Sequence, residues 1–465
     1  MYGVSWLLLI SIFAWRSRTV GMRRGFGEVM LLSLLVPTWA YFGASVGRVD
    51  WLPFKTEVDM RSGLGIACLL ACLTRPSIFK PWRWMLADGV VLALAATHVL
   101  SDWQNSGFSL VVPVRAFGEW VMPYLIGRIV LRDIDDLRNL YPVALGVALA
   151  LSGLGLVEMI ARTNLPEMLY GQRPMEFMGR EMSRWIFKRA YAVAKHPIFF
   201  STMLLLLMPW AMYAASRVKR GGGPNWYRWT PWIVGAGVVS SVSRGPILAL
   251  PVLFYVVALI CRPRWRVVLS VSGVLIVLLS AWQFQTIIKG LEVWSGESEY
   301  RRKREIVVAD EKVEFSGTRT RLYLPIVYAR ALREAGLLGY GTDAVTGFPP
   351  RVPVGQQYAE TLTRLQFVDN QYVLMTLRFG YLGLVCFTLL VGTAVYDYTR
   401  VALDSRSGVA FTAGMAGAIV AVMLVMITVW MPRDFGYLLL WSCGAGAALR
   451  SSKLSQSSYE PLPYP

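Results

Sequence analysis

The sequence predicts an all-α polytopic membrane protein with about 12–13 transmembrane helices and a large loop that contains short helices. The first observation is composition: of 465 residues, 55% are hydrophobic and 16% are charged, whereas soluble domains carry about 25% charged residues. The second is that apolar stretches of about 20 residues, which is the length that crosses a bilayer, recur along the whole chain. The third is the charge of the short connections between these stretches.

The expected spans lie at about 2–15, 26–46, 61–76, 84–101, 110–130, 140–161, 197–215, 230–242, 245–261, 266–284, 369–397, 409–431 and 434–449. The first span is short, and the eighth and ninth are tightly joined, so twelve spans stay an alternative to thirteen. Every second connection is basic, at about 16–24, 75–83, 128–138, 217–228, 262–266 and 400–406 and in the tail from 450. The positive-inside rule predicts that these connections are cytoplasmic.

This topology divides the chain into four parts. We expect a transmembrane bundle over 1–284 with a periplasmic loop at about 162–196, a large periplasmic loop over 285–368, C-terminal transmembrane helices over 369–449, and a disordered cytoplasmic tail over 450–465. The net charge of +18 then reflects cytoplasmic loops, and no nucleic-acid partner is expected. Arginines in the two long outer loops indicate an anionic ligand there, although solvated helix faces explain many of them.

One arginine stands in an apolar neighbourhood, in the sequence Ser241-Val242-Ser243-Arg244-Gly245-Pro246. A charge at membrane depth is costly, so such residues are usually paired or functional. The guanidinium fork of Arg244 matches phosphate oxygens, which favours a lipid-linked phosphate as its ligand. The alternative is an arginine that ends a helix and extends its side chain to the interface.

Three stretches, in order, resemble the O-antigen ligase and Wzy-type polymerase superfamily of bacterial envelope polysaccharide assembly. They are Arg189-Ala-Tyr-Ala-Val-Ala-Lys-His196-Pro197, then the turn 241–246, then a region from Arg319-Thr-Arg321 through Gly339-Tyr340-Gly341 to Asp369-Asn370-Gln371-Tyr372 and Gly380-Tyr-Leu-Gly383. The resemblance covers about residues 110–400. It implies a bacterial inner-membrane glycosyltransferase that uses undecaprenyl-diphosphate-linked saccharide as donor, with a periplasmic active site.

The resemblance also implies the partners and the site. The partners are the lipid-linked saccharide, a glycan acceptor, the lipid bilayer and, as an open possibility, a chain-length regulator. The residues expected to bind the diphosphate are Arg244, Arg319, Arg321 and Arg189, and the supporting residues are Ser243, Asn370, Tyr372, Gly339 and Gly341. Because arginines supply the charge stabilisation and the diphosphate is already a good leaving group, no metal or cofactor is expected.

The sequence departs from the family at one position. Ligases of this family carry a His immediately before the Asn, and this chain carries Asp369 there. We therefore favour a polymerase of oligosaccharide repeat units over a ligase that transfers glycan to lipid A-core or another acceptor. Asp369 is the candidate catalytic base if burial raises its pKa, and the alternative is that it caps the helix beginning at Asn370. His196 is the second candidate base, or else a hydrogen-bonded interfacial histidine.

Further expectations concern packing and competing classes. Residues 318–335 should form an amphipathic helix ending near Gly336, with Leu322, Ile326, Tyr328 and Leu332 facing the membrane domain. Inside or near the ends of spans, Glu119 and Glu158 should pair with arginines such as Arg115 and Arg162, and the alternative is that they line the lipid groove. A transporter of lipid-linked saccharides is the competing class, but it should show repeated halves, and the sequence has no visible repeat.

Overall fold

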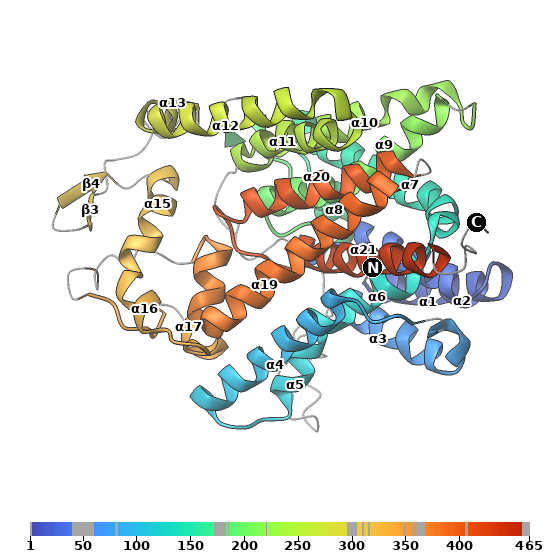
Figure 1. The fold of residues 1–465 in the computed structure, drawn as a ribbon, viewed down its shortest axis with the longest axis horizontal. Coiled ribbons are helices and arrows are strands. Elements are labelled where there is room, and N and C mark those ends of the chain that lie inside the picture. The colour runs from blue at the N-terminus through green and yellow to red at the C-terminus, as the bar shows by residue number, and fades with distance from the viewer. Residues whose placement is uncertain are drawn as a thin grey trace, which may run out of the picture.

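The computed structural model describes residues 2–39, 60–79, 82–171, 183–184, 186–219, 221–294, 305–308, 311–314, 317–346, 350–355, 358, 368–404 and 408–457. Helices make up most of this part of the chain (Figure 1), which confirms the predicted all-α class. Two short antiparallel hairpins are added to them, β1 (Ser183–Arg184) with β2 (Phe187–Lys188) and β3 (Glu305–Val308) with β4 (Glu311–Glu314).

The helices follow the order of the expected apolar stretches. The first half contains α1 (Tyr2–Thr19), α2 (Met22–Leu32), η1 (Ser33–Leu35), α3 (Met60–Leu73), η2 (Pro76–Phe79), α4 (Leu86–Ser106), α5 (Val111–Ala116), η3 (Phe117–Val121), α6 (Met122–Val130), α7 (Ile134–Ala161), α8 (Leu165–Tyr170), α9 (Pro197–Val218), η5 (Asn225–Trp229) and α10 (Thr230–Ser240). The second half contains α11 (Arg244–Cys261), η6 (Pro263–Trp265), α12 (Arg266–Trp282), α13 (Phe284–Trp294), α15 (Gly317–Val327), α16 (Ala329–Glu334), α17 (Thr342–Thr346), α19 (Gln371–Asp404), α20 (Val409–Val425) and α21 (Arg433–Ser457).

Six of the described helices are long and apolar enough to cross a membrane: α4, α7, α9, α11, the segment Pro263–Trp282 that contains α12, and α19. Two further apolar helices, Gly63–Leu73 and Val409–Val425, are shorter. The chain is therefore a multi-pass membrane protein. The total of 12–13 spans stays a prediction.

The core of the bundle surrounds α9. This helix is apolar on all sides and packs against α7, α10, α20 and α21. Of the most apolar 18-residue stretch of α9, 89% is buried inside the protein. By contrast, none of the corresponding apolar stretch in Pro263–Trp282 is buried. A helix that is apolar all round and lies outside the packed core must face lipid. We therefore interpret α12 as a lipid-exposed helix at the edge of the bundle.

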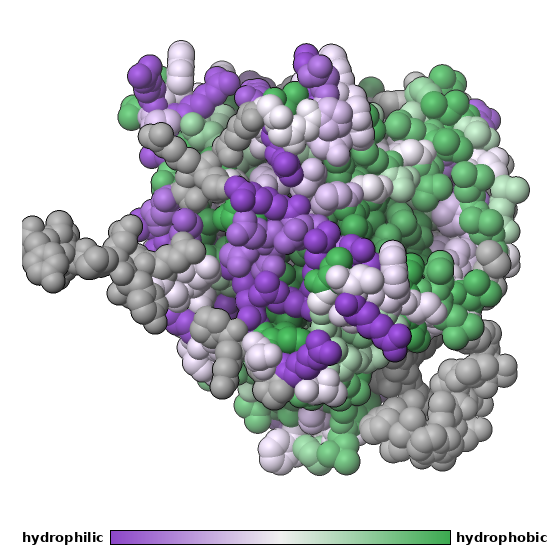
Figure 2. All heavy atoms as spheres, turned by 90° about the vertical axis from the view of Figure 1, so that its right-hand side faces the viewer, coloured by the Kyte–Doolittle hydropathy of each residue, from purple (hydrophilic) through white to green (hydrophobic). Residues whose placement is uncertain are grey.

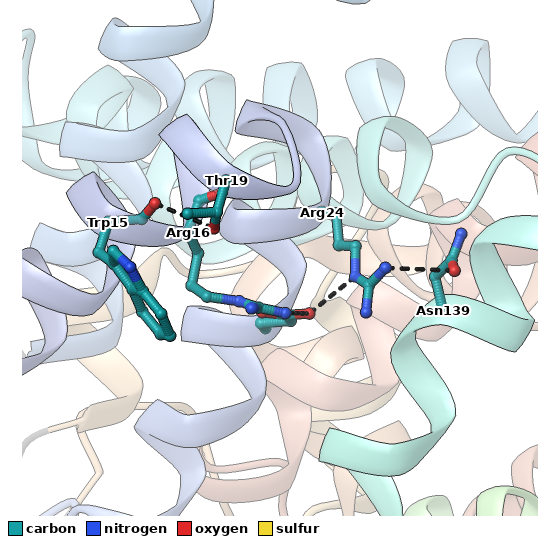
Figure 3. A network of polar contacts seen from close by, with 6 residues as sticks. Trp15, Arg16, Thr19, Arg24 and Asn139 are labelled. Carbon is teal, nitrogen blue, oxygen red and sulfur yellow. Dashed lines mark hydrogen bonds and ion pairs between the residues drawn. The ribbon is translucent and has the colours of Figure 1, made fainter.

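The basic connection between α1 and α2 is partly neutralised by buried carboxylates. Glu28 of α2 accepts hydrogen bonds from Arg16 and from Arg24, and Arg24 also donates to Asn139 of α7 over 3.3 Å (Figure 3). Arg23 of α2 forms a 2.6 Å ion pair with Asp136 of α7. Figure 2 views the side of the molecule that carries α1, α2 and the C-terminus, and hydrophilic side chains gather over its middle. These arginines thus hold the N-terminal helices to α7 as well as setting the charge of that side.

The segment from β3 to α17 lies beside the bundle (Figure 1) and has a small hydrophobic core of its own. Leu324, Val327, Tyr328 and Ala331 are buried there against the first turns of α19. Their spacing of three, four and seven residues defines the buried stripe of an amphipathic helix. The expected helix over 318–335 is confirmed, but it is divided into α15 and α16 at Tyr328.

One part of the predicted stripe was wrong. Ile326 is 44% exposed, because it falls between the positions that define the buried face. Tyr328 is buried and Leu332 is partly buried, as expected. The side chain of Leu322 lies outside the described residues. The turn after α16 occurs at Gly336, where φ is +59°, as the sequence predicts.

The chain after Gly336 docks onto a break in α19. At Gly380, φ is +66° and ψ is −167°, a conformation that is essentially restricted to glycine. The freed backbone groups pair with the docking segment: Tyr340 N–H donates to Leu377 O over 2.8 Å, and Tyr381 N–H donates to Gly336 O over 3.0 Å. A Cβ on Gly339 would lie 2.5 Å from the Gly380 nitrogen, so the two backbones approach as closely as they can.

Candidate functional site

The turn that presents Arg244 joins α10 to α11 and has an unusual backbone. Val242 adopts φ +47°, which is a strained conformation for a β-branched residue. Contacts on both sides hold the turn: Val242 N–H donates to Val239 O over 2.8 Å, and Arg184 Nη1 donates to Val242 O over 2.9 Å. Strain that the surroundings maintain at one turn is a feature of functional sites.

Arg189 lies against this turn although it is more than 50 residues away in sequence. Its Nη2 donates to Ser243 Oγ over 3.1 Å and its Nε approaches Ser241 O at 3.5 Å. Next to it, Ala190 N–H donates to Ser240 O over 3.2 Å. The first and second of the three motifs are therefore joined by direct hydrogen bonds.

Glu158 of α7 positions the segment that carries Arg189. This buried carboxylate accepts hydrogen bonds from Tyr191 N–H at 3.1 Å and Ala192 N–H at 2.8 Å. It also pairs with Lys188 at 3.3 Å. The expected pairing of Glu158 with Arg162 was wrong, because Arg162 follows the end of α7 in a left-handed conformation and donates instead to Ile186 O. A buried carboxylate that accepts backbone N–H groups fixes a loop more firmly than a surface ion pair does.

The other expected pairing, of Arg115 with Glu119, also differs in the structure. Arg115 lies 3.8 Å from Asp343 of α17. Because Asp343 is far away in the sequence, local spacing within α5 and η3 gave no sign of this contact.

His196 caps the N-terminus of α9. Its Nδ1 accepts a hydrogen bond from Ile198 N–H at 3.1 Å, so the proton of the neutral ring lies on Nε2. Burial lowers the pKa of His196 well below its usual value, and the positive charges of Arg189 and Arg321 lower this pKa further. The residue before it is also held, because Lys195 N–H donates to the buried carboxylate of Asp434 over 3.1 Å.

The third motif approaches the first near His196, through Arg321 and Asp369. Arg321 in α15 lies 3.8 Å from Asp369, which precedes α19, and these side chains are 25% and 37% exposed. Burial raises the pKa of Asp369, while the charge of Arg321 opposes that increase. Since Arg321 also acts electrostatically on His196, one partly buried region contains two arginines, a neutral imidazole and a carboxylate.

The cap of α19 is Asn370. Its Oδ1 accepts hydrogen bonds from Tyr372 N–H at 3.0 Å and Val373 N–H at 3.1 Å, which is the pattern of an N-cap side chain. The alternative role proposed for Asp369 as the helix cap is therefore wrong, because the neighbouring residue occupies that position. The carboxylate of Asp369 instead points toward Arg321.

Arg244 begins α11, and its Nη1 donates to Leu291 O of α13 over 2.5 Å. Because α13 in turn contacts α15, one helix, α13, links Arg244 to the helix that carries Arg321. Arg319 lies in α15 two residues earlier, and its side chain is outside the described residues. The geometry thus joins Arg189 to Ser243 and Arg321 to Asp369, with Arg244 on the same turn as Ser243.

Three of the supporting residues belong to the scaffold. Gly339 and Gly341 lie at the break in α19, where Gly341 N–H donates to Arg378 O and Asn105 of α4 donates to Gly339 O. The hydroxyl of Tyr372 donates to Met423 O of α20. From Asn370 to Gly380 is about 15 Å along a helix axis at 1.5 Å per residue, so this break supports the outer segment from a distance.

Sequence reasoning missed the residues that position the site. Glu158, Asp434 and Arg184 all bind backbone atoms of the segment or turn that carries the cationic side chains. The sequence signal for Glu158 and Asp434 was a carboxylate inside or at the start of an apolar span, which marks a functional or structural site in general. Arg184 was one of several arginines in the first long outer loop. Within the described residues, no three His, Cys, Asp or Glu side chains gather as a metal site.

The fold and this cluster define a multi-pass helical membrane protein with a cationic, partly buried site where the loop before α9, the α10–α11 turn and the start of α19 meet. Residues 230–388 match the family model described as O-antigen ligase. This match covers about a third of the chain, and it supports the resemblance of the motifs to the O-antigen ligase-like family. The matched segment includes Arg244, Arg321 and Asp369, whereas Arg189 and His196 precede it. No curated protein matches the chain.

Proposed function

We propose that this protein is an inner-membrane glycosyltransferase that polymerises undecaprenyl-diphosphate-linked oligosaccharide repeat units. The O-antigen ligase family supports the broader class, an enzyme that acts on lipid-linked saccharides. The observation that carries the finer proposal is the 3.8 Å pair of Arg321 and Asp369 in the electrostatic neighbourhood of His196. This arrangement offers cations for a diphosphate and a carboxylate for an acceptor hydroxyl in one place.

In the proposed reaction the acceptor hydroxyl oxygen attacks the anomeric carbon of the donor sugar. The new glycosidic C–O bond forms as the bond from the anomeric carbon to the diphosphate oxygen breaks, and the diphosphate leaves with that electron pair. Arg244, Arg321 and Arg189 stabilise the departing negative charge. Arg319 is assigned to the same group because of its place in the motif. Asp369 accepts the hydroxyl proton, and its raised pKa improves it as a base.

His196 is the weaker of the two candidate bases. Its Nδ1 is occupied by the Ile198 N–H, and the depressed pKa of the ring opposes proton uptake. We therefore assign His196 to positioning α9 and Asp369 to proton transfer. Ser243 holds Arg189, and Asn370 fixes the backbone next to Asp369.

The alternative within the family is a ligase that transfers the glycan to lipid A-core or another acceptor. The family relationship is compatible with both reactions. The carboxylate at position 369, where ligases of the family carry a His, favours the polymerase. A chain-length regulator is a further partner that this proposal allows.

We propose that the site faces the periplasm. The alternation of basic connections supports this, because the α9–η5 connection is basic and lies at the end of α9 opposite to His196. Reporter fusions after Lys219 and after Ile306 should report opposite sides of the inner membrane. If both fusions report the same side, the proposed topology and the shared site are wrong.

The variant Arg244→Lys tests the proposed function. It keeps the charge but loses the bidentate fork, so polymer formation should fall by about 10-fold or more, in the range of one charge-assisted contact to a transition state. Cells that lack the native copy should be complemented with each variant, with polymer resolved on a gel and protein level measured by blot. Arg266→Lys is the matched control, because Arg266 donates to the last carbonyls of α11 at the opposite end. Full-length polymer from Arg244→Ala would contradict the enzyme proposal itself.

A further inference from the structure

A cavity of about 1000 Å³ lies at the other end of α11 from Arg244. It opens between the C-terminal ends of α9 and α11 and the beginnings of α10 and α20. Most of its wall is apolar, including Met212, Trp232, Phe254, Val257 and Val409. Since the 18-residue α11 spans about 27 Å at 1.5 Å per residue, the cavity and Arg244 lie near opposite surfaces of the membrane.

The rim of this cavity is cationic. Lys219 at the end of α9 and Arg228 of η5 line it and are both exposed, and none of the lining residues that the structure describes is acidic. The Arg228 guanidinium is oriented by Asn225, which also lines the cavity: Nε donates to the Asn225 carbonyl oxygen and Nη2 to its Oδ1, both over 3.1 Å. A held guanidinium beside a lysine is a binding arrangement for a phosphate.

The combination of an apolar wall with a cationic rim matches one class of ligand. An open cavity between spanning helices must be filled by acyl chains at membrane depth, because the hydrocarbon region contains no water. Basic residues at the ends of the same helices lie at the level of the headgroups, where pockets of this kind bind anionic lipids. Trp232, which is 72% exposed, is the type of side chain that lies at that interface.

We propose that this cavity binds an anionic phospholipid of the bilayer, with its phosphate on Lys219 and Arg228 and an acyl chain between Trp232 and Phe254. The site is separate from the cluster around Arg321, and the proposal does not depend on the glycosyltransferase function. Its charge selects anionic over zwitterionic lipid, and its apolar wall selects a lipid over a soluble phosphate.

The chain contains a reporter for this site. Cys261 lines the cavity and is exposed, whereas Cys68, Cys72, Cys386 and Cys443 are buried. The full-length protein should be placed in nanodiscs of phosphatidylcholine alone or with added phosphatidylglycerol, and the rate of maleimide labelling at Cys261 should be measured. Phosphatidylglycerol should slow labelling of the wild-type protein. Native mass spectrometry of the released protein should show retained phosphatidylglycerol in preference to phosphatidylcholine.

The double variant Lys219→Gln/Arg228→Gln should lose both effects. Because each cation near an anionic headgroup contributes about 5-fold in affinity, the loss of both should lower retention of phosphatidylglycerol by about 30-fold. Arg264→Gln is the control, since Arg264 lies at the same end of α11 but does not line the cavity. Thermal unfolding of the three proteins checks that the exposed substitutions leave the fold intact.

Three results would overturn the proposal. If phosphatidylglycerol slows labelling equally in the wild-type protein and the double variant, its effect comes from the surface potential and not from a site. If inorganic phosphate protects Cys261 in phosphatidylcholine nanodiscs as well as phosphatidylglycerol does, the site binds free phosphate and is not a lipid site. Equal retention of both lipids by the wild-type protein would likewise remove the role of Lys219 and Arg228.

Discussion

Replacing Asp369 with Asn is expected to abolish detectable polymer while the protein level stays unchanged. The substitution keeps the shape of the side chain and removes its ability to accept a proton, so the rate should fall by about 100-fold or more, the usual contribution of a general base. The helix should not be affected, because the cap of α19 is Asn370. Polymer length should be measured by gel in cells that lack the native copy.

Asn370→Ala is the matched control for this variant. It removes a helix cap, so it should lower the free energy of unfolding by about 1 kcal/mol and leave residual polymer in proportion to the folded protein. Loss of polymer from Asp369→Asn at unchanged protein level reports the carboxylate itself. Loss of polymer from Asn370→Ala beyond the loss of folded protein reports the position of Asp369. Full-length polymer from Asp369→Asn would exclude Asp369 as the base and return attention to His196.

The pH dependence provides a second measurement on the same residue. A base acts when deprotonated, so activity should be present above the pKa of Asp369 and should be lost as the pH falls through it. Because burial raises this pKa, the loss should begin at a higher pH than for an exposed aspartate, whose pKa is about 3.9. The rate of transfer by purified protein should be measured against pH with a lipid-linked saccharide donor.

The second large effect is expected at the break in α19. In Gly380→Ala the new Cβ would lie 2.3 Å from the backbone of Leu337, and an L-residue at φ +66° adds about 1–2 kcal/mol of strain. The segment 336–341 should therefore detach from α19, lowering the melting temperature and exposing the chain before α19 to protease. Both should be measured on the purified protein in detergent.

Gly392→Ala provides the comparison within the same helix. A Cβ at Gly392 meets no atom within 4 Å, and alanine is favoured over glycine in a helix by about 1 kcal/mol, so this variant should be as stable as the wild type or more so. If the two variants have the same melting temperature and the same resistance to protease, the close approach of the two backbones at Gly380 does not hold the segment 336–341 on α19.

The sequence predicted the all-α class and the order of the apolar helices because hydropathy and length are local properties of the chain. It also placed the outer-loop helix and its end at Gly336, since the helical period and a glycine are visible in the sequence. It assigned Ile326 to the wrong face, because the division of the helix at Tyr328 and the true stripe through Leu324 depend on contact with α19. The site residues themselves stay predictions, although the structure now connects Arg189 with Ser243 and Arg321 with Asp369.

The amino-acid sequence alone determined the class of the protein, the apolar segments and the motifs that resemble the O-antigen ligase-like family, since each depends on composition and short-range order. Only the tertiary structure decided that α9 is buried and α12 is not, although both are apolar, because burial depends on which helices pack around them. It also decided that Asn370 and not Asp369 caps α19, and that Glu158 binds the backbone beside Arg189. These contacts depend on where backbone N–H groups lie in space, and a single sequence does not contain that information.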